Sequence, residues 1–122
     1  MPTVLLVEDH PLNRKLFRDI LGFEFEVVEA ETAEVARDKL QNLVPDLILT
    51  DIQLPGMDGI TFVRELKKDP KFVGVPVVAI SAHAMPRDIA LAREAGCVDY
   101  ITKPITDDPF VFLERLMRSM NR

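Results

Sequence analysis

The polarity pattern of the chain alternates between short apolar runs and longer segments in which apolar residues recur every three or four positions. Short apolar runs between turn-forming residues are typical of strands buried on both faces, and the longer spacing is typical of amphipathic helices. The runs predict five strands, at residues 3–8, 25–28, 47–49, 75–80 and 98–102. Each run is followed by a segment with helical spacing, so the chain is predicted to contain five helices as well.

Capping and turn residues mark the ends of the predicted helices, because a side-chain oxygen in front of a helix can accept one of its free backbone N–H groups. Pro11 suits the first position of the first helix, and Gly22 can end that helix. The other predicted boundary residues are Asp9 or His10, Thr32, Asp58, and Asp107 or Asp108 as N-caps, with Pro86 opening the fourth helix and Gly96 ending it.

Apolar stripes predict which faces of the first and last helices are buried. The stripe of the first helix consists of Leu12, Leu16, Phe17, Ile20 and Leu21. The stripe of the last helix consists of Phe110, Leu113, Leu116, Met117 and Met120. Val111 and Phe112 lie off this second stripe, and we expect them to be partly exposed.

The alternation of strand and helix predicts an α/β fold in which helices cover both faces of a parallel sheet. Connections this short favour right-handed crossovers between neighbouring units. One doubly wound family of this size, the flavodoxin-like (βα)5 fold, has strand order 2-1-3-4-5. We therefore predict a doubly wound five-stranded parallel sheet in that order, formed by residues 1–122 as a single domain.

Composition limits the classes of protein to which the chain can belong. With 122 residues, 48% hydrophobic and 29% charged, it is typical of one soluble globular domain. No apolar run approaches the ~20 residues of a membrane span, and the N-terminus does not resemble a signal peptide, so we expect a cytoplasmic protein with no membrane contact. The net charge of −5 argues against direct binding to DNA. Cys97 is the one cysteine and is predicted to be a buried, unreactive thiol.

Polar side chains follow four of the five predicted strands. Glu8 and Asp9 follow the first strand, and Asp51, Ser81 and Lys103 follow the third, fourth and fifth. Strand order 2-1-3-4-5 makes the first and third strands neighbours, so the three acids are expected to share one crevice. Like charges held together disfavour ionisation, and a bound divalent cation would remove that cost.

Mg²⁺ fits these residues, because it prefers oxygen ligands and usually takes one or two carboxylates. Asp9 and Asp51 are predicted as direct ligands, together with the backbone carbonyl of Gln53, and Glu8 is predicted to act through a water molecule. With no cluster of Cys or His, zinc is a poor candidate. A carboxylate beside such an ion can attack phosphorus, so Asp51 is also a candidate nucleophile that forms an aspartyl phosphate.

Phosphoryl transfer depends mostly on positioning and on neutralisation of charge, so a cation and a hydroxyl are needed near the phosphoryl oxygens. Lys103 and Ser81 supply one of each. Taken alone, an aspartate at a strand end usually caps a turn, and a lone serine or lysine there is usually structural or solvated. The functional interpretation depends on the combination. His83 either lines the mouth of this site or is an exposed loop residue, and no role is assigned to His10.

Four segments resemble the receiver domains of two-component response regulators, and the resemblance extends over essentially the full chain. The segments are VLLVED at residues 4–9, DLILTDIQLPGMDG at 46–59, PVVAISA at 76–82 and YITKP at 100–104. Within the family, residues 12–17, 81–85 and 96–97 look most like the stand-alone cell-division regulators.

The resemblance implies that Asp51 accepts a phosphoryl group from a sensor histidine kinase or a histidine phosphotransfer protein. It also implies that Glu8, Asp9 and the Gln53 carbonyl hold Mg²⁺, that Ser81 and Lys103 occupy the family's hydroxyl and lysine positions, and that Tyr100 occupies its aromatic switch position. The peptide bond before Pro104 is expected to be cis, as is usual in the family.

We therefore hypothesise a switch rather than an enzyme. Phosphorylation of Asp51 draws the Ser81 hydroxyl toward the phosphoryl group and lets Tyr100 turn inward. The surface formed by the fourth helix, the fifth strand and the last helix then changes and binds a downstream protein. The protein is expected to be a monomer or a dimer linked to phosphorylation.

Four alternatives remain open at this stage. Two of them are an interaction module that is not phosphorylated and a receiver fragment of a larger hybrid kinase. A Mg²⁺-dependent phosphohydrolase with an aspartate nucleophile usually has a second acid two residues later, and Gln53 stands there. A flavin-binding protein would share only the fold, because the chain has no phosphate loop.

Overall fold

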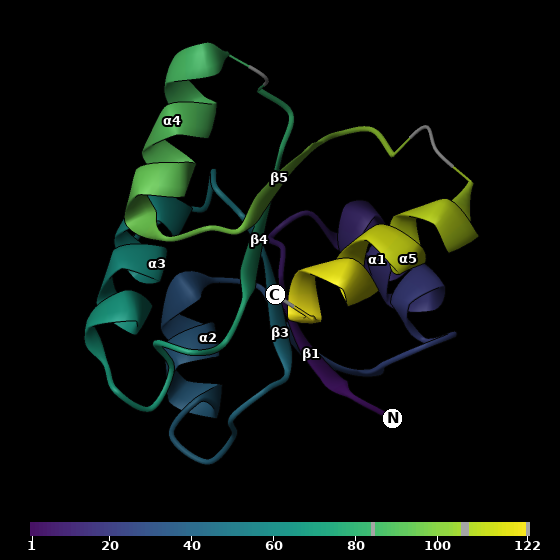
Figure 1. Ribbon diagram of the computed structural model, residues 1–122, viewed down its shortest axis with the longest axis horizontal. Coiled ribbons are helices and arrows are strands. Elements are labelled where there is room, and N and C mark those ends of the chain that lie inside the picture. Colours follow the sequence, from purple (N-terminus) through teal and green to yellow (C-terminus); the bar gives the residue numbers. More distant parts are fainter. Residues whose placement is uncertain (84, 106–107, 122) are drawn as a thin grey trace.

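A parallel sheet of five strands in the order β2-β1-β3-β4-β5 forms the centre of the molecule (Figure 1). The computed structural model describes residues 1–83, 85–105 and 108–121. Ala84, in the segment at residues 81–85, and Asp107, one of two predicted N-caps, lie outside the described residues. The strands are β1 (Thr3–Val7), β2 (Glu26–Ala30), β3 (Leu47–Asp51), β4 (Val77–Ser81) and β5 (Asp99–Thr102). The predicted fold class and strand order are confirmed.

Helices cover both faces of the sheet, with α2, α3 and α4 on one side and α1 and α5 on the other (Figure 1). Their bounds are α1 (Pro11–Leu21), α2 (Ala33–Lys39), α3 (Gly59–Lys68), α4 (Pro86–Ala95) and α5 (Pro109–Met120). Within the described residues, no helix combines the length and the apolar character that are needed to cross a membrane.

The core has two layers, one on each face of the sheet, because successive residues of a strand point to opposite faces. In β1, Leu5 and Val7 belong to the layer under α2, α3 and α4, and Val4 and Leu6 to the layer under α1 and α5. All four side chains are fully buried. This burial on both faces explains why the central strands are continuous apolar runs rather than alternating patterns.

The helix N-caps follow the sequence prediction at three helices. Thr32 accepts a hydrogen bond from the Val35 N–H at 3.0 Å, and Asp58 accepts one from the Thr61 N–H at 2.9 Å. Asp108 caps α5. At α1 the N-cap is His10, and its side chain makes no capping hydrogen bond. Pro11 at the next position needs no partner because it has no N–H.

The buried faces of α1 and α5 differ from the predicted stripes. Leu12 and Leu16 are 74% and 52% exposed, and the buried residues of α1 are Phe17 and Leu21. On α5, Phe112 is buried, which contradicts its predicted exposure, and Phe110 is 62% exposed. Val111 is exposed as predicted. Adjacent stripes of an α-helix are one residue apart in sequence, so packing against other elements selects between them. Here the rings of Phe17 and Phe112, on the buried faces of α1 and α5, lie 6.1 Å apart between centroids.

Cys97 is buried as predicted. Burial raises the pKa of its thiol to about 12, and the nearby charge of Lys67 offsets this only in part. The reactive form of cysteine is the thiolate, which is therefore scarce in the folded protein at neutral pH.

We expect Phe112→Ala to lower the free energy of unfolding by about 3–5 kcal/mol, because it leaves a cavity between α1, α5 and the sheet. Phe110→Ala is the matched control, since it removes a mostly exposed ring from the same helix, and should change stability by less than about 1.5 kcal/mol. Urea unfolding of both variants measures the difference. Equal losses would contradict the observed orientation of α5.

We expect the Cys97 thiol of the folded protein to resist disulfide-exchange reagents at pH 8 and to react quickly once urea unfolds the chain. Raising the pKa from 9.0 to about 12 lowers the thiolate fraction by about 1,000-fold below pH 9. Above pH 9 the unfolded chain loses this proton while the folded chain retains it, so the free energy of unfolding should decrease with rising pH. Rapid labelling of the folded protein at pH 8 would contradict the burial of this thiol.

Candidate functional site

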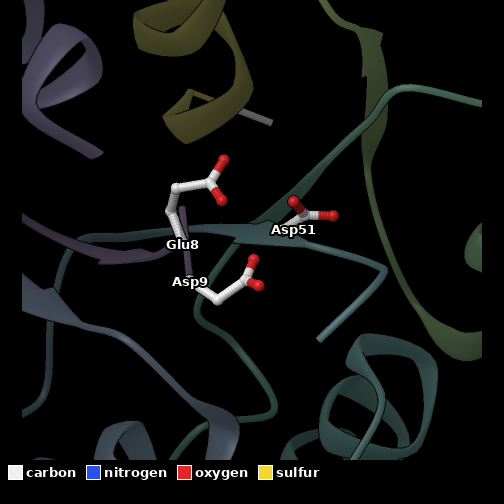
Figure 2. A group of neighbouring side chains, drawn as sticks. All are labelled: Glu8, Asp9 and Asp51. Atoms are coloured by element: carbon white, nitrogen blue, oxygen red, sulfur yellow. The ribbon is translucent and has the colours of Figure 1, made fainter. Parts of the chain in front are cut away.

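Three carboxylates meet where β1 and β3 end. Glu8 and Asp9 directly follow β1, Asp51 is the last residue of β3, and these strands are paired from Val4–Leu47 to Val7–Thr50. One oxygen of each carboxylate lies within 4.8 Å of the others (Figure 2). Glu8 and Asp51 are buried, and Asp9 is exposed. The predicted shared crevice is therefore present.

Lys103 directly follows β5, which is an edge strand of the sheet, and its side chain reaches this cluster. Its Nζ lies 2.6 Å from Asp51 Oδ2 and 2.5 Å from Glu8 Oε1. The Lys103 side chain is itself mostly buried, so these ion pairs are only weakly screened by water. One positive charge therefore lies between two buried negative charges.

The pKa shifts at the site reflect both burial and pairing. Burial raises the pKa of Glu8, and the hydrogen bonds from Lys103 and the His10 N–H offset this only in part. Burial by itself would lower the pKa of Lys103, but the hydrogen bonds and charges of Asp51 and Glu8 outweigh it, so the pKa of Lys103 is raised. Lys103 therefore remains a cation at neutral pH.

The backbone around Asp51 is held by the start of α3. The Gln53 N–H donates to Asp51 Oδ1 at 2.8 Å, and the Gly59 N–H donates to the Ile52 carbonyl at 2.9 Å. A Cβ at position 59 would lie 2.4 Å from the carbonyl oxygen of Asp51. Only glycine therefore allows the first turn of α3 to pack this closely against the end of β3.

Ser81 of β4 and Tyr100 of β5 both form hydrogen bonds to the backbone of His83. Ser81 is buried, and its Oγ accepts the His83 N–H at 3.1 Å. Tyr100 is also buried, and its hydroxyl donates to the His83 carbonyl at 2.7 Å. The Lys103 N–H donates to the Ser81 carbonyl at 2.7 Å, and the Lys103–Pro104 peptide is cis as predicted. These contacts connect the end of β4 to the residues after β5.

Two residues at the site have roles that sequence reasoning left open or missed. His83 is exposed at the mouth of the site, where its Nδ1 contacts the side-chain amide of Gln53. Sequence reasoning gave Arg14 of α1 no role, but its guanidinium donates to the Glu8 carbonyl at 3.2 Å and lies 3.4 Å from Glu29. Neither contact has a sequence signal, because each joins residues from different elements.

A cavity of about 300 Å³ lies beside the site, next to Lys103. Its lining combines residues of α1 with the residues that follow β4 and β5, namely Asn13, Leu16, Phe17, Ala82, Lys103, Pro104 and Ile105. Leu16, which was predicted to lie in the core, is instead exposed and lines this cavity.

The donor set of the site is suited to a hard divalent cation. Glu8, Asp9 and Asp51 offer carboxylate oxygens at close range, and Mg²⁺ and Ca²⁺ prefer such ligands. Three carboxylates and one ammonium, that of Lys103, leave excess negative charge at the site, which a cation would offset.

Comparison with known proteins gives one consistent family. The family model described as "Response regulator receiver domain" matches residues 4–112. The polar-differentiation response regulators DivK of Brucella ovis and Brucella anthropi are each 40% identical to the chain over 110 residues, which is 89% of this chain and 89% of theirs.

Solved structures agree with this family. The receiver domain of a sensor histidine kinase from Pseudomonas aeruginosa, with a magnesium ion coordinated in its active-site cleft, superposes with a TM-score of 0.88 at 28% identity and covers 99% of this chain and 98% of that one. The chemotaxis protein CheY4 of Vibrio cholerae superposes with a TM-score of 0.89 at 25% identity and covers 98% of both chains.

We expect Gly59→Ala to lower the free energy of unfolding by about 1–3 kcal/mol, because the added Cβ must push α3 away from the end of β3. Gly74→Ala is the matched control, since a Cβ there meets nothing within 4 Å. It should leave stability within about 0.5 kcal/mol of the unsubstituted protein. Denaturant unfolding of the two variants tests the close approach at Asp51, and equal stabilities would contradict it.

Proposed function

The chain belongs to the response regulator receiver domain family, and from this membership we propose that it accepts a phosphoryl group on Asp51 and signals through protein contacts. The observation that carries the proposal is the position of the Asp51 carboxylate. One oxygen accepts the Gln53 N–H and the other contacts the Lys103 ammonium, beside two further carboxylates. This arrangement combines a fixed nucleophile with a cation and the ligands of a metal site.

The residues of the crevice fit Mg²⁺, and we propose Asp9, Asp51 and the Gln53 backbone carbonyl as its ligands, with Glu8 acting through water. When bound, the ion neutralises the negative charge that otherwise keeps an anionic phosphoryl donor away from the carboxylates. The magnesium-bound receiver domain from Pseudomonas aeruginosa supports this choice of ion.

We propose separate roles in phosphoryl transfer for Asp51, Lys103 and Ser81. A carboxylate oxygen of Asp51 attacks the phosphorus of a phosphohistidine, and the new P–O bond forms as the P–N bond breaks. The electron pair of that bond stays on the imidazole nitrogen of the donor. Lys103 pairs with charge that develops on the phosphoryl oxygens, and the Ser81 hydroxyl donates a hydrogen bond to one of them.

The phosphoryl donor is proposed to be a sensor histidine kinase or a histidine phosphotransfer protein. Leu12 and Leu16 are exposed on α1, and Leu16 lines the cavity next to Lys103. An apolar helix surface beside the site suits a helix of the donor protein, which must bring its phosphohistidine to Asp51. We therefore propose that the exposed Leu12 and Leu16 contact the donor protein, which they could not do if they were buried.

We propose that the output surface comprises α4, β5 and α5, and that Ser81 and Tyr100 connect it to Asp51. To shift a two-state equilibrium from 1:99 to 99:1, phosphorylation must favour one state by about 5.5 kcal/mol. Contacts from Lys103 and Ser81 to a phosphoryl group are charge-assisted and have this order of strength together. Tyr100 is buried in this structure. Its inward rotation upon phosphorylation stays a prediction.

The chain is similar to DivK over most of its length, and we propose a related role in cell division or polar differentiation, exerted in the cytoplasm by residues 1–122 as one domain. Receiver domains are signalling proteins, so we propose that its chemistry is limited to gain and loss of its own phosphoryl group. A downstream protein, rather than DNA or a membrane, would then receive the signal.

We expect the intact mass of the protein to increase by one phosphoryl group after incubation with acetyl phosphate and Mg²⁺. Asp51→Asn should abolish the gain, because an amide is not a nucleophile toward phosphorus, and a chelator should abolish it in the unsubstituted protein. Mass spectrometry at neutral pH measures each case.

A receiver domain known to accept phosphate from acetyl phosphate serves as the positive control for the same reagents. If that control is modified and this protein is not, the phosphoacceptor proposal fails, and an interaction module that is not phosphorylated becomes the better interpretation. If Asp51→Asn is still modified, the proposed acceptor is wrong.

A further inference from the structure

The loop between β3 and α3, residues 52–58, contains Gln53, whose backbone carbonyl is a proposed Mg²⁺ ligand. We infer that Glu34, in the first turn of α2, is a positioning residue that holds this loop in place for Mg²⁺ binding. The inference rests on the proposed function, and it concerns a residue outside the strand-end cluster of Glu8, Asp9, Asp51, Ser81 and Lys103.

Two observations place the Glu34 carboxylate on the backbone of this loop. Its Oε2 accepts the Met57 N–H at 3.3 Å. A Cβ at Gly56 would lie only 2.6 Å from the same oxygen, so the carboxylate occupies the space that a side chain at position 56 would need. Gly56 has φ +74°, a conformation that favours glycine in any case. The turn at Gly56 and Met57 and the carboxylate of Glu34 therefore fit one another.

α2 is a firm support for this contact. Thr32 caps the helix, and Ala33 and Ala36 are fully buried under it, so the backbone that presents Glu34 is fixed by the core. One turn further along, Arg37 forms an ion pair with Glu65 of α3 at 3.2 Å. The same helix face thus contacts first the loop and then the helix that follows the loop.

The ends of the loop are attached to β3 and α3 by other bonds. At its start the Gln53 N–H is bonded to Asp51, and at its end the Asp58 side chain caps α3. Glu34 acts between these points, on Met57. Loss of this contact gives the loop more freedom, so its carbonyl at Gln53 is less often in place for a cation.

Glu34 is exposed and negatively charged, so its charge could also attract a cation without any contact to the loop. Glu34→Gln separates these effects, since the amide carbonyl of glutamine can accept the Met57 N–H but has no charge. A positioning role predicts that Glu34→Gln resembles the unsubstituted protein and that Glu34→Ala does not.

The experiment is a calorimetric titration of unphosphorylated protein with Mg²⁺, followed by phosphorylation rates with acetyl phosphate across Mg²⁺ concentrations. We expect Glu34→Ala to raise the dissociation constant for Mg²⁺ about two- to tenfold, the effect of one hydrogen bond. The rate at saturating Mg²⁺ should change less than twofold, because Asp51, Ser81 and Lys103 are untouched. Glu34→Gln should remain within twofold in both measurements.

Arg37→Gln is the matched control, because it removes the ion pair between α2 and α3 but leaves the contact to Met57. It should not change the dissociation constant. Gly56→Ala is a second test, since its Cβ displaces the carboxylate; it should weaken Mg²⁺ binding more in the unsubstituted protein than in Glu34→Ala. Circular dichroism verifies that each variant is folded.

The outcomes separate this inference from the proposed function. If the unsubstituted protein neither binds Mg²⁺ nor gains a phosphoryl group, the proposed function fails, and this inference falls with it. If the unsubstituted protein does both, three results overturn the positioning role alone. These are a Glu34→Ala variant with unchanged affinity, a Glu34→Gln variant as weak as Glu34→Ala, and an Arg37→Gln variant with the same loss.

Discussion

The contact of Lys103 with Glu8 and Asp51 is the interaction on which the rest of the site depends. Parallel strands β1 and β3 bring their carboxyl ends together, and burial of two carboxylates there is unfavourable without a cation. Lys103 is 95 residues from Glu8 and 52 residues from Asp51 in the chain. The ion pairs therefore join the start, the middle and the end of the fold at one point.

The proposed phosphorylation of Asp51 would act directly on these ion pairs. Lys103 is a neighbour of Ser81 through the backbone hydrogen bond between β4 and the loop after β5, and Ser81 and Tyr100 both bond to the backbone of His83. A change of charge on Asp51 alters the balance at the Lys103 ammonium first. These short connections lead from there to β5, so few residues separate Asp51 from the surface that we propose as the output.

The two faces of the sheet support the site in different ways. On one face, α3 presses its first turn against the end of β3 through Gly59, and α2 reaches the same loop through Glu34. On the other face, α1 leaves Leu12 and Leu16 exposed, Leu16 next to the cavity beside Lys103, and buries Phe17 against α5. One face thus fixes the backbone around Asp51, and the other leaves exposed the apolar residues that we propose contact the phosphoryl donor.

Local patterns in the sequence determined the strands, the caps at Thr32 and Asp58, and the acids at the strand ends, because each depends on neighbours within a few residues. Strand order was predicted by analogy with one doubly wound family of this size, not from any local pattern, and the structure confirms it. The tertiary structure alone decided that Phe112 rather than Phe110 is buried, and that Arg14 and Glu34 contact the site loops. An α-helix offers adjacent stripes that differ by one residue, and packing against distant elements selects between them, which a local pattern does not record.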